Sequence, residues 1–135
     1  MKTRTIVLLF AVLLGSISVT FAQTAGQNTS NDKVEVYYFH NERRCATCVA
    51  VEDESVKALN ELYPEKMKSG EMTFLSVNLE DDANKALADK FKISGQTLLI
   101  VKGGKQENLT NTAFMYATTK PEKLKKAIGQ AIEKL

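Results

Sequence analysis

Histidine and cysteine, which hold metals or carry redox chemistry in many proteins, are scarce in this chain. Its 135 residues include one histidine, His40, and only two cysteines, Cys45 and Cys48. A structural zinc site takes four protein ligands. Two thiolates do not complete such a site, so His40 or a partner would have to contribute the missing ligands.

Long hydrophobic runs are also absent. The longest, residues 6–14, has nine apolar residues, whereas roughly 20 are needed to span a bilayer. It follows Lys2 and Arg4 and precedes small residues that end at Ala22, as in a secretory signal peptide. We therefore predict a signal at residues 1–22, cleaved after Ala22, and export to the periplasm or to the cell exterior; whether the segment is retained as an anchor stays open. No cysteine lies near the cleavage point, which excludes lipid attachment there.

An excess of either charge is absent too. The predicted signal holds two of the 18 basic residues and none of the 16 acidic ones, which leaves 16 of each. A chain with balanced charge lacks the excess of positive charge that is typical of proteins that bind nucleic acid or an anionic membrane. After a polar leader at residues 23–32, residues 33–135 are long enough for one domain with a modest core, and we expect a monomer.

Apolar periodicity predicts four strands and three helices. The first strand, residues 34–39, is apolar on both faces, which is typical of a strand covered on both sides. Residues 46–63 form a helix with one apolar face, on which Glu52, Asp53 and Glu54 are expected to point to water.

The other elements follow from turn and capping signals. The predictions are a helix end at Pro64, strands at 72–79, 97–101 and 105–109, a short helix capped by Asp81 or Asp82 and ending at Phe91, a hairpin turn at Gly103 and Gly104, and a last helix opened by a capping box of Thr119 and Glu122. Residues 111–118 are expected to extend the fourth strand or to form a loop.

This order, βαβαββα, predicts an α/β fold with a four-stranded mixed sheet and helices on both faces. The first two strands are joined through a helix and should be parallel, and the hairpin should add antiparallel strands. Cys45 and Cys48 then lie where the first strand leads into the first helix, at the carboxyl end of a strand, where such sheets usually carry their sites.

The two cysteines are three residues apart and can close a disulfide or share one electrophile. A structural disulfide usually closes a long loop, and this pair closes almost none, so a redox pair is the better interpretation. The amino end of a helix favours a thiolate, and Arg43 and Arg44 add positive charge beside Cys45. We therefore predict that Cys45 is the attacking thiol and Cys48 the partly buried resolving thiol.

The segment from Cys45 to Cys48 resembles the C-x-x-C site of the thioredoxin family at the same strand-to-helix junction. Residues 77–81 resemble that family's next strand-to-helix segment, and residues 91–105 resemble its later strand and hairpin. The resemblance covers about residues 33–135, and it implies a thioredoxin-like fold and thiol–disulfide exchange.

The chain departs from the thioredoxin pattern around the cysteines. Arg44 stands where the family has a tryptophan, and Thr47 where it has a proline between the cysteines. The residue six before Cys45 is Phe39, where the family has a buried aspartate, so the role of that aspartate is not carried over.

A further departure concerns the segment that faces the cysteines in the family. Gln96 replaces the cis-proline that precedes the family's counterpart of Thr97. By position, Gln96 and Thr97 are expected to modulate the site together with Arg43 and Arg44. Loss of the proline would weaken peptide binding and leave the thiols more open to a metal.

A shorter motif gives a second resemblance. Tyr38-Phe39-His40 followed by Arg44-Cys45-x-x-Cys48 is similar to small exported proteins labelled the nitrophenyl-compound nitroreductase subunit ArsF family. Nothing in the chain resembles a flavin or nicotinamide site, so we predict no cofactor.

Three functions stay open at this stage. The first is an exported thiol–disulfide oxidoreductase that acts on protein or small-molecule thiols and disulfides, with a redox partner protein that is soluble or membrane-bound. The second is binding of a soft metal or metalloid through Cys45 and Cys48, with His40 as a third ligand. The third is a non-catalytic thioredoxin-like binding module.

Overall fold

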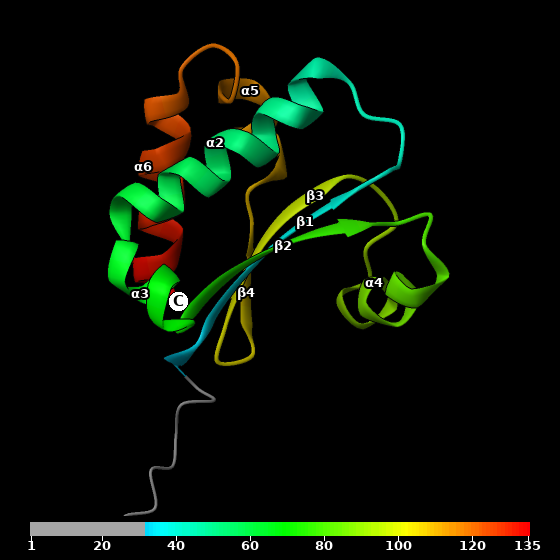
Figure 1. The fold of residues 1–135 in the computed structure, drawn as a ribbon, viewed down its shortest axis with the longest axis horizontal. Coiled ribbons are helices and arrows are strands. Elements are labelled where there is room, and N and C mark those ends of the chain that lie inside the picture. Colours follow the sequence, from blue (N-terminus) through cyan, green and yellow to red (C-terminus); the bar gives the residue numbers. More distant parts are fainter. Residues whose placement is uncertain (1–31) are drawn as a thin grey trace, which may run out of the picture.

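The structure is a computed structural model that describes residues 32–135. The predicted signal at residues 1–22 and nearly all of the leader at 23–32 lie outside the described residues. A single sheet forms the centre of the described part, with helices on both of its faces (Figure 1). Within this part, no helix combines the length and the apolar character needed to cross a membrane.

Four strands and six helical segments follow one another in residues 32–135. In order they are β1 (Val34–His40), α2 (Ala46–Leu62), α3 (Pro64–Ser69), β2 (Met72–Asn78), the 3-10 helix η1 (Asp82–Asn84), α4 (Lys85–Phe91), β3 (Thr97–Lys102), β4 (Lys105–Asn108), α5 (Thr110–Tyr116) and α6 (Pro121–Lys134).

The strand order in the sheet is β2-β1-β3-β4. Strand β1 runs parallel to β2 and antiparallel to β3, and β3 pairs antiparallel with β4. Phe39, near the end of β1, lies opposite Val77 of β2 and Thr97 of β3. The predicted four-stranded mixed sheet is therefore confirmed, and the start of β3 lies at the same edge of the sheet as the end of β1.

Central strand β1 separates two apolar cores. Val36 and Tyr38 point into the larger core, which α2, α5 and α6 cover, whereas Tyr37 and Phe39 point into a smaller core beneath α4. These four side chains are almost fully buried. Burying one large apolar side chain contributes about 1.5–3 kcal/mol, so the strand that leads to the cysteines is also one of the most strongly held.

Helix α5 corrects the prediction that residues 111–118 extend a strand or form a loop. The Asn108 side chain accepts hydrogen bonds from the backbone N–H of Thr110, at 3.0 Å, and from its hydroxyl, at 2.6 Å. These bonds satisfy groups at the start of the helix, and Ala113 is fully buried in the larger core. A short helix with one small buried residue has too little apolar periodicity to be recognised.

The predicted helix end before Pro64 is confirmed, since α2 ends at Leu62. Pro64 also begins α3, a helix that was not predicted, because proline is tolerated in the first turn of a helix. A second predicted boundary is wrong. The capping box at α6 does not form: Thr119 Oγ1 donates to the carbonyl of Met115, at 3.0 Å, and the N-cap Lys120 makes no side-chain capping bond. The Asp81 cap is confirmed, since its carboxylate accepts from Ala83 N at 2.9 Å.

Candidate functional site

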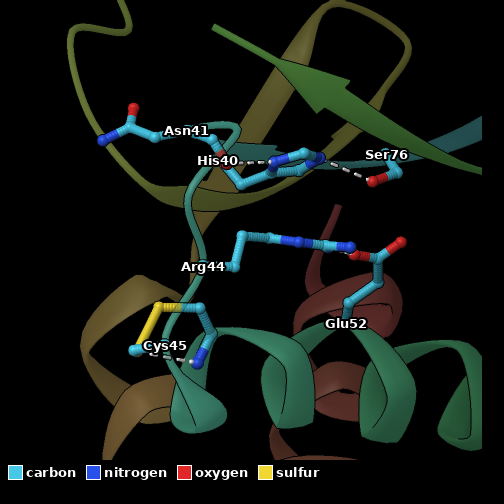
Figure 2. Close-up of polar contacts among 7 residues, drawn as sticks. His40, Asn41, Arg44, Cys45, Glu52 and Ser76 are labelled. Atoms are coloured by element: carbon cyan, nitrogen blue, oxygen red, sulfur yellow. Dashed lines mark hydrogen bonds and ion pairs between the residues drawn. A yellow bond between two sulfur atoms is a disulfide. The ribbon is translucent and has the colours of Figure 1, made fainter.

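Cys45 and Cys48 are joined by a disulfide at the start of α2, with their Cα atoms 5.0 Å apart (Figure 2). Cys45 is the N-cap of the helix and has extended backbone geometry. Its Sγ accepts a hydrogen bond from the backbone N–H of Cys48 at 3.2 Å. The first turn of α2 contains no acidic residue. A negative charge on Cys45 would therefore meet a backbone donor and the positive end of the helix dipole.

The two cysteines differ strongly in exposure. Cys45 is exposed, whereas Cys48 is 2% exposed. A substrate can reach the first sulfur but not the second. This asymmetry is what the predicted division into an attacking and a resolving thiol requires, although the roles themselves stay predictions.

Gln96 and Thr97 lie at the same edge of the sheet as the loop that leads to the cysteines, because Thr97 pairs with Phe39. Thr97 is buried, and its Oγ1 donates to the carbonyl of Gly95 at 2.9 Å. Gln96 is half-buried. Among residues 32–135 there is no cis peptide bond, and no hydrogen bond joins either residue to a cysteine. The structure thus places both at the same edge of the sheet as this loop, and their predicted role in the site stays a prediction.

The charge of Arg44 is directed elsewhere than the sequence suggested. Its Nη1 donates to Oε2 of Glu52 in an ion pair that spans the first turns of α2 (Figure 2). The side chains are only 29% and 20% exposed, so Glu52 is not the fully solvated residue that the helix pattern predicted. Arg43 is exposed and forms no ion pair with the other described residues. Of the two arginines, Arg43 is the one whose charge is unpaired near Cys45.

His40 ends β1 and is 9% exposed. Its Nδ1 is 2.8 Å from the carbonyl oxygen of Asn41, and its Nε2 is 2.9 Å from Ser76 Oγ (Figure 2). A carbonyl can only accept, so Nδ1 carries a proton, and in the neutral ring Nε2 accepts from the Ser76 hydroxyl. Both nitrogens are used to tie the loop to β2.

These contacts leave His40 without a free nitrogen to serve as the third ligand that the alternative of soft-metal binding would need. In the part of the chain that the structure describes, no three or more His, Cys, Asp or Glu side chains are grouped so that they could hold a metal ion. The soft-metal hypothesis would therefore rest on Cys45 and Cys48 alone, after reduction of their disulfide.

Tyr38 is a further polar residue on β1, to which the sequence assigned no role of its own. It is fully buried, its ring centroid is 5.8 Å from that of His40, and its hydroxyl has no hydrogen-bond partner among the described residues. Burial raises the pKa of Tyr38 above 10.0, and the positive charge of Arg44 opposes this rise. The sequence held one signal for the closeness of Tyr38 and His40. Side chains alternate between the two faces of a strand, so residues two apart on β1 lie on the same face.

The comparisons with known proteins concern mainly the fold. No protein-family model and no curated protein matches the chain. Among solved structures, oxidised thioredoxin O2 from Arabidopsis thaliana is 19% identical, with a TM-score of 0.50 over 76% of this chain and 81% of that one. The thioredoxin of Fasciola hepatica is 22% identical and oxidised Arabidopsis thioredoxin O1 21%; each match covers 77% of this chain and 86% of the other, with a TM-score of 0.48.

The chain therefore has a thioredoxin-like fold, as the sequence predicted. Within this fold, a C-x-x-C pair joined as a disulfide lies at the start of α2. The likeness to the nitrophenyl-compound nitroreductase subunit family stays a resemblance of a short motif, since no family model matches.

Proposed function

We propose that this protein is an exported thiol–disulfide oxidoreductase in which Cys45 attacks and Cys48 resolves. One observation carries the proposal: an exposed sulfur at the start of α2 is bonded to a buried one directly behind it. A disulfide that served only stability would gain little from so short a loop, whereas a redox couple needs one accessible sulfur and one nearby partner.

The reaction follows from this arrangement. In the reduced protein, the Cys45 thiolate attacks one sulfur of a substrate disulfide, and the other substrate sulfur leaves and takes up a proton. The Cys48 thiol then loses its proton and attacks Cys45 Sγ, which releases the second substrate thiol and re-forms the protein disulfide. Two electrons pass to the substrate, and a thiol donor must return them; run in reverse, the same steps oxidise a dithiol.

Three features favour the thiolate of Cys45 in the reduced protein. It caps α2, whose dipole stabilises a negative charge by about 0.3–1 kcal/mol at an exposed site. The Cys48 N–H points at its sulfur, and a hydrogen bond to a charged group contributes about 1.5–3 kcal/mol. Arg43, two residues before Cys45, adds a positive charge that has no ion-pair partner among the described residues. Together they make Cys45 the better nucleophile at neutral pH.

The proposal includes the cellular setting that the sequence predicts. The signal at residues 1–22 would deliver the domain to the periplasm or the cell exterior, where disulfides persist. Substrates would be protein or small-molecule thiols and disulfides, and the electrons would come from or go to a redox partner protein, soluble or membrane-bound. We propose a monomer that needs no cofactor.

The test uses Cys48→Ser, which removes the resolving thiol. With an aromatic disulfide such as 5,5′-dithiobis(2-nitrobenzoic acid), this variant should form a stoichiometric mixed disulfide that persists, detectable by mass. Cys45→Ser, which leaves only the buried thiol, should react far more slowly, and the double serine variant should not react. Equal rates for the two single variants would contradict the assignment of roles, and full function of the double variant in cells would favour a passive binding module.

A further inference from the structure

The loop before Cys45 is held by polar contacts at three points. His40 ties its start to Ser76, and the backbone N–H of Glu42 donates to Glu80 Oε1 at 3.3 Å. Arg44, the last loop residue, is tied to Glu52 of the following helix. The contact between Arg44 and Glu52 differs from the other two because Arg44 carries the charge that is nearest in sequence to Cys45.

The ion pair carries that charge away from Cys45. Glu52 is the seventh residue of α2, roughly two turns beyond the N-cap. In Figure 2 the Arg44 side chain extends from the loop toward Glu52 and away from the disulfide. The guanidinium is therefore both neutralised by a carboxylate of α2 and directed away from the disulfide.

We propose that Glu52 is a positioning residue that sets the redox balance of the pair through Arg44. This inference rests on the proposed function. While Glu52 holds the guanidinium, Cys45 is stabilised as a thiolate mainly by the start of the helix and by Arg43. Without the carboxylate, the Arg44 charge is unpaired one residue from Cys45, the thiolate is favoured, and reduction of the disulfide becomes easier.

Other titratable groups lie on the loop and on the strands that flank it. They are Tyr38 and His40 on β1, Glu42 and Arg43 in the loop, and Glu80 after β2. His40 and Glu80 already have partners of their own. Among the carboxylates that lie in the loop or contact it, Glu42, Glu80 and Glu52, it is Glu52 that pairs with a cation next to the cysteines, Arg44.

The experiment compares Glu52→Gln, Arg44→Gln and the double variant by equilibrating each reduced and oxidised protein with glutathione. One unpaired charge within about 10 Å of a partly solvated thiolate changes the equilibrium constant about three- to tenfold. Glu52→Gln should shift the constant toward the reduced protein by that factor, Arg44→Gln should shift it toward the oxidised protein, and the double variant should lie near the wild type. The rate of Cys45 alkylation against pH should move in parallel, with its midpoint at lower pH for Glu52→Gln.

Glu54→Gln is the matched control, because Glu54 lies on the same helix and its carboxylate pairs with Lys57 instead, at 3.9 Å. It makes the same change of charge and should leave the equilibrium near the wild-type value. Shifts of the same sign for Glu52→Gln and Arg44→Gln would indicate that the pair acts only by holding the loop, and would overturn the inference. So would equal shifts for Glu52→Gln and Glu54→Gln. If the wild type does not cycle with glutathione at all, the proposed function itself fails.

Discussion

Two neighbouring tyrosines of β1 should respond in opposite directions to loss of their hydroxyl groups. Tyr38 is fully buried and its hydroxyl has no hydrogen-bond partner among the described residues, whereas the Tyr37 hydroxyl donates to Glu35 Oε2 at 3.0 Å. Phenylalanine keeps the ring at either position. The change at Tyr38 thus removes only an uncompensated polar group, and the change at Tyr37 removes a hydrogen bond to a charged acceptor.

The magnitudes follow from these contacts. A buried polar group without a partner costs about 1–3 kcal/mol, so Tyr38→Phe should raise the free energy of unfolding by about that amount. A hydrogen bond to a charged group contributes about 1.5–3 kcal/mol. Because Glu35 is partly exposed, Tyr37→Phe should lower the free energy of unfolding by an amount at the lower end of this range. For a domain of this size, 1 kcal/mol corresponds to roughly 4–8 °C in Tm.

The assay is urea unfolding of the oxidised proteins, followed by far-ultraviolet circular dichroism because the chain has no tryptophan. The slope of the unfolding free energy against urea should be the same for all three proteins, so that midpoints can be compared directly. A Tyr38→Phe protein that is less stable than the wild type by 1 kcal/mol or more would refute the reasoning. It would show that the buried hydroxyl has a partner, such as an ordered water.

Two further predictions concern the same strand. His40→Ala removes two partly buried hydrogen bonds and should lower the free energy of unfolding, measured in urea, by about 1–3 kcal/mol. The variant should still form a mixed disulfide through Cys45, and loss of that reactivity would instead give His40 a chemical role. The pKa of Tyr37 is raised to about 12, chiefly by burial and then by its bond to Glu35, so the folded state favours the neutral phenol. That stabilisation is complete below pH 10 and should be lost as the pH rises through about 12; an alkaline stability profile of Tyr37→Phe identical to that of the wild type would contradict this.

The main features of the fold could be predicted because they depend on local patterns. Strand β1 is apolar on both faces, and Gly103 and Gly104 allow the positive φ of a tight hairpin, so the centre of the sheet and its turn were visible in the sequence. The place of the cysteines followed from the order of elements. Helix α5 was missed because a polar side chain, Asn108, starts it, and its apolar pattern is short.

The electrostatics of the site could not be predicted in the same way. Arg44 and Glu52 are eight residues apart and meet because a loop residue folds back along the next helix, which no helical spacing rule anticipates. His40 is held by Ser76, 36 residues away on a paired strand. The contact of His40 needs the register of β1 and β2, and the contact of Arg44 needs the path of the loop beside α2. Neither is visible in local sequence patterns, so the sequence indicated a solvated Glu52 and left the role of His40 open.

The reduction potential of the Cys45–Cys48 pair, measured by equilibration with glutathione or dithiothreitol, tests the central claim most directly. A catalytic pair should lie between roughly −120 and −270 mV, and its place in that range would separate an oxidant from a reductant. A value below about −300 mV, typical of structural disulfides, or a pair that does not cycle, would contradict a redox function for this site.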